Sequence, residues 1–215
     1  MKVVRIDEIA PTPSAGATTA DRWIPLRAVL GVRAFGLSAY LGDAGDVVVP
    51  RHQETGAGAG GHEEVYVVTR GRAFFVLDGE TVDAPAGTCV FAEPGEPREA
   101  RAEEAGTIVV AVGAPRDEPY RIAPWEYGSR AARARQLGQI DELERVVAEG
   151  IATYGDHVTM LIGKACVAAQ HGRRDEALDL LERAAADEDF SDWARGEAAS
   201  EPLLDPVRDD PRFPQ

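Results

Sequence analysis

Residues 63–97 read EEVYVVTRGRAFFVLDGETVDAPAGTCVFAEPGEP and decide the fold of the first half of the chain. Short runs rich in Val, Phe and Tyr alternate there with Gly, Pro and Asp, a pattern typical of antiparallel strands joined by tight turns. The pair Asp78-Gly79 suits the positive backbone angles of a two-residue hairpin turn. Similar runs fill residues 29–112, so the sequence predicts an antiparallel β-sandwich or β-barrel.

The chain changes character after Pro124, where Ala, Leu, Glu and Arg predominate and Gly or Pro stand at the breaks. Two similar segments, GQIDELERVVAEGI from Gly138 and GRRDEALDLLERAA from Gly172, start 34 residues apart. This spacing is the period of tetratricopeptide helical hairpins. We therefore expect an α+β chain of two domains: a β domain with an N-terminal arm over residues 1–127, and an α-helical hairpin repeat unit over residues 128–215.

Composition excludes several classes of protein. The 215 residues include 23 Lys and Arg against 37 Asp and Glu, a net charge of −14, so we expect no nucleic-acid partner, which would need a basic surface. No apolar run has the length of a membrane span or a signal peptide, which predicts a soluble, cytoplasmic protein without a membrane partner. Cys89 and Cys166 lie far apart in apolar segments, which favours buried thiols over a disulfide. The preference for Arg over Lys is typical of a bacterial genome rich in G and C.

Two motifs stand out in the β domain. In the first, six residues separate Glu64 from Gly71. The second begins at Gly87, continues with TCVFA, and reaches EPGEP at residues 93–97. These two motifs resemble those of the cupin superfamily. The resemblance covers about residues 47–112 and implies a cupin-like β-barrel, which is a double-sheet jelly roll, with a metal site inside it.

The resemblance also implies which side chains hold that metal. His52 corresponds to the first histidine of the cupin site, Glu54 lies where the second is expected, and Arg98 stands in place of the last. Strand alternation places His62 and Glu64 on one face, and likewise His52 and Glu54. His52, His62 and Glu64, with Glu54 as a fourth donor, would suit a divalent transition metal such as Zn, Mn, Fe or Ni.

Arg98 favours a second interpretation, because a guanidinium stays charged and repels a divalent ion. An inward Arg98 is expected to pair with Glu54 or Glu64, or to bind an anionic ligand in a bidentate manner. The first hypothesis is thus a cupin-like protein that binds a small, anionic molecule through Arg98, Glu54 and Tyr66, its metal site partly lost. The alternatives are a metal-dependent oxygenase or isomerase using His52, His62 and Glu64, and a scaffold with a buried salt-bridge network.

The remaining predictions concern catalysis and partners. A metal-free enzyme with His62 as general base, beside Glu64 and Tyr66, also fits the strand pattern, so the sequence leaves open whether the protein is an enzyme. The helical unit either binds a protein partner or only supports the barrel. A homodimer is expected to form through the barrel edge, with residues 22–30, RWIPLRAVL, as an edge strand or arm. The stretch GAGAGG at residues 56–61 predicts a mobile loop at the barrel mouth, since it lacks the Lys of a phosphate loop.

Overall fold

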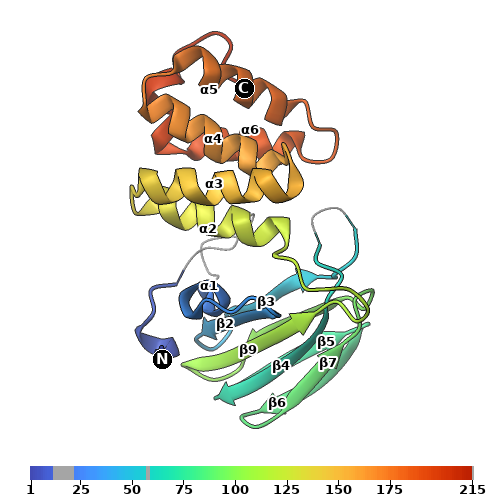
Figure 1. Cartoon of the computed structure of the whole chain (residues 1–215). Helices are drawn as coiled ribbons and strands as arrows, with labels where there is room; N and C mark the ends of the chain where they lie inside the picture. Colours follow the sequence, from blue (N-terminus) through green and yellow to red (C-terminus); the bar gives the residue numbers. More distant parts are fainter. Residues whose placement is uncertain (12–21, 57–58, 215) are drawn as a thin grey trace. The chain divides into compact units, whose positions relative to one another are not determined.

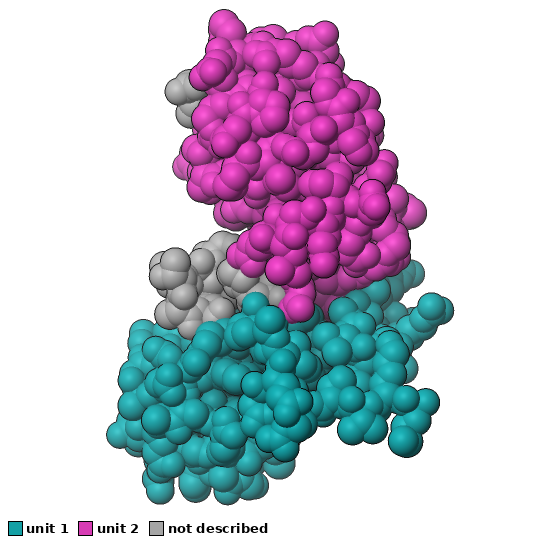
Figure 2. Space-filling view, turned by 90° about the vertical axis from the view of Figure 1, so that its left-hand side faces the viewer, with its two compact units in different colours: residues 1–123 teal, residues 124–215 magenta. Residues whose placement is uncertain are grey.

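The computed structural model describes residues 1–11, 22–56 and 59–214, which form two compact units, Met1–Ala123 and Pro124–Gln215 (Figure 1). Figure 2 colours the two units separately. The described part of the first unit carries the β-strands, and the second unit is helical. The predicted α+β class with antiparallel sheets is confirmed. The predicted domain boundary after residue 127 falls inside the first long helix, which begins at Pro124.

Two open sheets, all of whose paired strands are antiparallel, make up the β unit. In the five-stranded sheet the order is β1 (Arg22–Ile24), β2 (Gly36–Gly42), β9 (Thr107–Ala114), β4 (Glu63–Arg70) and β7 (Cys89–Ala92). In the four-stranded sheet the order is β3 (Val47–His52), β8 (Arg98–Ala102), β5 (Arg72–Leu77) and β6 (Glu80–Pro85). Strands that follow one another in the chain therefore often belong to opposite sheets.

The core of the β unit lies between the two sheets, because alternate side chains of each strand point inward. Tyr66 and Val68 of β4 are buried, whereas Val65, which precedes Tyr66 on the same strand and points to the opposite face, is 37% exposed. Both sheets contribute to one buried cluster, which contains Val48, Val49, Tyr66, Val68, Ala73, Phe75, Ala84, Val90, Ala92, Ala100, Ala102, Val109 and Ala111. The inward positions of β4 and β8 thus change from apolar to polar toward Glu64 and Arg98.

The turn between β5 and β6 confirms the hairpin predicted at Asp78-Gly79. Asp78 has φ 44° and Gly79 has φ 86°, and Leu77 pairs with Glu80 across the turn. A two-residue turn that matches the right-handed twist of its flanking strands requires positive φ at both central residues.

The segment predicted as an edge strand or arm, residues 22–30, divides into two elements. Its start forms β1, at the edge of the five-stranded sheet, and its end forms the short helix α1 (Leu26–Leu30). Gly31 ends α1 with φ 78°, a left-handed conformation that glycine adopts without steric cost. A 3-10 turn, η1 (Ile6–Glu8), lies in the described part of the N-terminal arm.

The second unit is built from α2 (Pro124–Gln136), α3 (Ile140–Tyr154), α4 (Val158–Gln170), α5 (Arg174–Ala185), α6 (Ser191–Ser200) and the 3-10 helix η2 (Pro202–Val207). Helix α4 is its centre, with ten buried residues, and it contacts the other four α-helices and η2. Among the described residues, no helix combines the length and the apolar character that crossing a bilayer requires.

The two cysteines differ in their surroundings. Cys166 is buried in α4, as predicted, but the prediction of a buried Cys89 is wrong. Strand β7 turns Val90 and Ala92 into the core, so Cys89 and Phe91 face outward, Phe91 with 49% exposure. An apolar run on a strand does not reveal which alternate residues face the core.

Candidate functional site

Polar side chains from three strands meet at one end of the β core. His52 is the last residue of β3 and pairs with Arg98, the first residue of β8, because these two strands run antiparallel. Glu64 and Tyr66 lie two residues apart on β4, which places both on the inward face. Glu54 lies two residues beyond the end of β3 and is buried.

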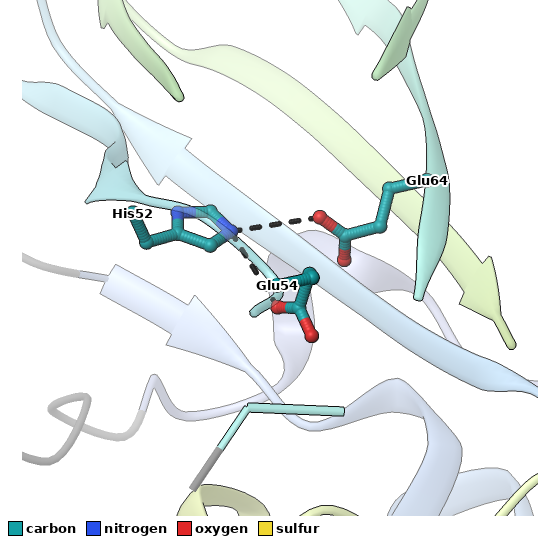
Figure 3. A group of neighbouring side chains, drawn as sticks. All are labelled: His52, Glu54 and Glu64. Carbon is teal, nitrogen blue, oxygen red and sulfur yellow. Dashed lines mark ion pairs between the residues drawn. The ribbon is translucent and has the colours of Figure 1, made fainter. Parts of the chain in front are cut away.

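His52, Glu54 and Glu64 form a group that could hold a metal ion. One ligand atom from each residue lies within 4.8 Å of the others. Figure 3 shows the imidazole of His52 pointing toward both carboxylates, with Nε2 at 3.5 Å from Glu64 Oε2 and 3.8 Å from Glu54 Oε1. The His52 side chain is 30% exposed, whereas those of Glu54 and Glu64 are 6% and 13% exposed, so solvent reaches the group along the imidazole.

The backbone fixes the proton on the His52 ring. Nδ1 of His52 lies 2.7 Å from the carbonyl oxygen of Pro50. A carbonyl oxygen can only accept, so Nδ1 donates and the neutral ring carries its lone pair on Nε2. Burial would lower the pKa of His52, but its contacts with Glu64 and the Pro50 carbonyl raise the pKa. The Tyr66 hydroxyl lies 3.4 Å from the same Nε2. A cation between this lone pair and the two carboxylates, either a proton or a metal ion, would stabilise all three groups.

Glu64 is held as a charged carboxylate by Arg98 and Tyr66, and by His52 when a proton occupies its Nε2. Arg98 Nη2 lies 2.8 Å from Glu64 Oε2, and the Tyr66 hydroxyl donates a short hydrogen bond to the same oxygen. Burial would raise the pKa of Glu64, but the hydrogen bonds of His52, Tyr66 and Arg98 outweigh it and lower the pKa to about 2. Burial and the nearby charge of Glu64 raise the pKa of Tyr66 well above its ordinary value, so Tyr66 remains a neutral donor.

The guanidinium of Arg98 is fully buried and bound to the protein. Besides the contact with Glu64, Nε donates to the Tyr66 hydroxyl at 3.2 Å and Nη1 donates to the Glu96 carbonyl at 2.9 Å. Of the partners that the sequence left open for Arg98, the structure therefore shows Glu64. All three guanidinium nitrogens donate within the protein, and none is exposed to a ligand.

His62 lies behind Glu54 and outside the three-residue group. Its Nδ1 is 3.8 Å from Glu54 Oε2, whereas His52 faces Oε1 of the same carboxylate. His62 is 4% exposed, its ring lies 5.3 Å from that of Tyr120, and its Nε2 has no hydrogen-bond partner among the described residues. The structure thus brings together His52, Glu54 and Glu64, and it places His62 next to Glu54 alone.

The Gly-rich loop positions both Glu54 and His62. The backbone N–H of Gly60 donates to Glu54 Oε2 at 2.9 Å, and a Cβ at this position would stand 2.4 Å from the ring of His62. Of the loop predicted over residues 56–61, positions 57 and 58 lie outside the described residues.

The carbonyl of Pro50 is a member of the site that the sequence did not identify. Strand β3 lies at the edge of the four-stranded sheet, and its pairing with β8 shifts register between Val49 and His52. Such a bulge is where a proline fits within a strand, since proline has no N–H for the ladder. The signal was therefore Pro50 inside the run VVVPRH, which indicates an irregular edge strand close to His52.

Similarity to known proteins is found among solved structures. No protein-family model and no curated protein matches the chain. The chain is similar to a protein described as a predicted oxalate decarboxylase from Thermotoga maritima, with 22% identity, a TM-score of 0.42, and coverage of 52% of this chain and 97% of that one. It is also similar to a sugar phosphate isomerase of the cupin superfamily from Silicibacter pomeroyi, with 16% identity, a TM-score of 0.43, and coverage of 54% and 83%. An RmlC-like cupin from Desulfovibrio desulfuricans gives 22% identity, a TM-score of 0.35, and coverage of 54% and 92%. The structural neighbours are cupin-family proteins.

Proposed function

We propose that the β unit is a cupin-like jelly roll that binds a divalent transition metal through His52 Nε2, Glu54 and Glu64, and that the metal in turn binds a small anionic molecule. One observation carries the proposal. Because His52 Nδ1 donates to the Pro50 carbonyl, its Nε2 lone pair faces two carboxylates, and the three groups together offer the ligand atoms of a metal site. A ring nitrogen fixed by a backbone carbonyl is also the usual support of a metal-binding histidine.

The donor set fits the metals expected from the sequence. One imidazole nitrogen and two carboxylate oxygens suit Zn, Mn, Fe or Ni, and three protein ligands leave positions open for a small molecule. Each ligand residue is oriented by its own hydrogen bond: His52 by Pro50, Glu54 by Gly60, and Glu64 by Tyr66 and Arg98. A bound metal would supply a Lewis acid that polarises the molecule bound to it.

The charges of the site support an anionic ligand. Glu54, Glu64 and Arg98 together carry one net negative charge with His52 neutral, and a divalent ion makes the net charge positive by one. A singly charged anion then neutralises the site. The guanidinium nitrogens of Arg98 and the hydroxyl of Tyr66 are engaged with the protein, so the anion binds the metal in this proposal, and Arg98 acts through its charge.

As an enzyme, the protein would be an isomerase or an oxygenase that uses this metal site. His62 has no place among the three ligands, because Glu54 stands between its ring and His52. We assign His62 the role of a positioning residue that fixes Glu54. Its buried Nε2 has no hydrogen-bond partner among the described residues, and in this proposal it forms a hydrogen bond with the bound ligand.

For the helical unit we propose two tetratricopeptide-like hairpins, α3 with α4 and α5 with α6. In support, α3 begins at Ile140 and α5 at Arg174, which is 34 residues later. The last segment closes the unit, because Leu204, Val207 and Phe213 are buried. A protein partner for this unit, a homodimer of the chain and a cytoplasmic location stay predictions.

Metal analysis of the full chain, purified without an affinity tag or chelator, tests the proposed site. Near one equivalent of transition metal is expected in the wild type and in His171→Ala, a control histidine at the end of α4. His52→Ala and Glu54→Gln are expected to lose the metal. Absence of binding after incubation of the wild type with Zn, Mn, Fe(II) and Ni would refute the proposal.

A further inference from the structure

Arg98 is the fixed positive charge of the site. Its side chain has no exposed surface, and its Nη2 lies 2.8 Å from the Glu64 oxygen that also faces His52 Nε2 at 3.5 Å. The Glu96 carbonyl and the Tyr66 hydroxyl hold the other two nitrogens. The guanidinium therefore cannot turn away when an ion arrives.

A divalent ion bound at this site would share Glu64 with the positively charged guanidinium of Arg98. The guanidinium and the Tyr66 hydroxyl already use Oε2 of Glu64, and an ion at His52 Nε2 stands close to both. Two like charges at this distance repel each other in a buried site, where water screens them weakly. The same charge attracts any anion that binds to the ion.

We infer that Arg98 is the specificity-determining residue of this site, because its charge lowers the affinity for the divalent ion and raises the affinity for the anion on that ion. The inference rests on the proposed function. Without Arg98, the two carboxylates carry two negative charges and a divalent ion neutralises them completely. Such a site holds the metal more tightly and leaves no net charge to attract an anion.

Opposite changes in two affinities distinguish this role from simple damage to the fold. Loss of packing around a buried side chain would weaken the binding of both metal and anion. Loss of a charge strengthens one and weakens the other. The two measurements on one variant therefore test the charge itself.

The experiment uses the full chain, Co²⁺ as the metal and acetate as the anion. Calorimetry gives the Co²⁺ affinity, and the visible spectrum of the Co²⁺-loaded protein reports acetate binding. For Arg98→Gln we expect Co²⁺ to bind about tenfold more tightly or better, and acetate about tenfold more weakly, where a factor of ten corresponds to ~1.4 kcal/mol. Arg98→Lys, which keeps the charge, should stay close to the wild type.

Arg101→Gln is the matched control. Arg101 lies on the same strand as Arg98 but is exposed, and its Nη1 contacts the Gly45 carbonyl at 3.4 Å. Removing its charge is expected to leave both affinities unchanged, because solvent screens it. A change in Arg101→Gln as large as that in Arg98→Gln would overturn the assignment of the effect to Arg98.

The outcomes separate the inference from the proposed function. If the wild type binds Co²⁺ but both affinities fall or stay constant in Arg98→Gln, the inference is wrong and the metal site stands. If the wild type binds no Co²⁺ but Arg98→Gln does, the proposed function is wrong and the role of Arg98 stands. If neither protein binds Co²⁺, both are wrong.

A second measurement applies if Arg98→Gln folds poorly. The melting temperature of Arg98→Gln should rise more with Co²⁺ than that of the wild type, since the ion replaces the missing positive charge beside Glu64. An equal or smaller rise would overturn the inference.

Discussion

Each unit of the protein buries an arginine beside carboxylates, and the other neighbours of the two arginines differ. In the helical unit, Arg135 of α2 pairs with Glu197 of α6, and its Nε lies 3.2 Å from Glu201 Oε2. The Arg135 side chain is 8% exposed, and that of Arg98 is fully buried. In both clusters the guanidinium is therefore neutralised almost without the help of water.

The neighbours of the two arginines set the clusters apart. Beside Arg98 stands the imidazole of His52, and beside Arg135 stands the thiol of Cys166. Burial raises the pKa of Cys166 to about 12, although Arg135 lowers it, so the thiol stays protonated at neutral pH. A buried arginine with carboxylates thus indicates a structural cluster. A histidine lone pair directed at the carboxylates is what distinguishes a site for a cation.

The largest effect on stability is expected from Arg135→Gln. This change leaves Glu197 and Glu201 without their cation and should lower the free energy of unfolding of the helical unit by about 3–5 kcal/mol. Urea unfolding followed by the helical circular dichroism signal measures the loss. Arg145→Gln, a surface control in α3, should stay close to the wild type.

Zn²⁺ tests whether the histidine distinguishes the two clusters. In Arg135→Gln, Zn²⁺ should restore none of the lost stability of the helical unit, because no histidine is among the residues that pair with Arg135. A recovery with metal would show that a buried cluster without a histidine also binds a cation, and the proposed distinction would be wrong.

Tyr66→Phe should have the next largest effect. The change removes a donor to Glu64 and the acceptor of Arg98 Nε, so we expect a loss of about 1.5–3 kcal/mol in the free energy of unfolding. Metal binding should persist, because Tyr66 is not a ligand in the proposed site. Urea unfolding and a Co²⁺ titration of the same variant check both statements. Loss of metal with full stability would instead place Tyr66 among the ligands.

A smaller effect is expected from Gly60→Ala. The added Cβ would stand 2.4 Å from the ring of His62 and should cost about 1 kcal/mol or more as the ring and loop shift. Because Gly60 also donates to Glu54, the metal affinity should fall with the stability. Gly95→Ala is the matched control, since a Cβ there meets no described atom within 4 Å. Equal stability and equal metal affinity of the two variants would show that the Gly-rich loop does not position Glu54 and His62.

The smallest effect on stability at neutral pH is expected from changes at the two cysteines. Exposed Cys89 should react at once with a thiol reagent at pH 8, and Cys166 should react after unfolding; Cys89→Ser should abolish the fast phase. The pKa of Cys166 in the folded chain, about 12, lies above its ordinary value of 9.0. Its contribution to stability is therefore complete below pH 9 and is lost as the pH rises toward 12. A stability that is constant over this range would contradict the burial of a protonated thiol.

The success of the sequence predictions follows the regularity of the backbone. Alternation placed Glu64 and Tyr66 correctly on one face, because both lie within β4. The same rule, applied to His62 and Glu54, does not hold for them, since β4 begins at Glu63 and β3 ends at His52. The positions of these two side chains depend on the path of a Gly-rich loop, which no periodicity describes.

The partner of Arg98 shows a second limit. Sequence and charge reduced the choice to Glu54, Glu64 or an anionic ligand, and the selection of Glu64 depends on which strands face each other. Strand β4 belongs to one sheet and β8 to the other, so the contact between Glu64 and Arg98 crosses the sandwich. Such pairing is a property of topology, which local patterns do not determine.

The position of β9 has a consequence for the order of folding during synthesis. Thr107–Ala114 pairs with β2 on one side and with β4 on the other, yet it is the last of the described strands of the β unit to be synthesised. Before it emerges, β1 with β2 and β4 with β7 are two separate ribbons, and two-stranded ribbons are marginally stable in water. In the nascent β unit, the two ribbons must therefore avoid non-native pairing until β9 has been synthesised. Docking of β9 between them is the long-range and hence slow step in the folding of this sheet.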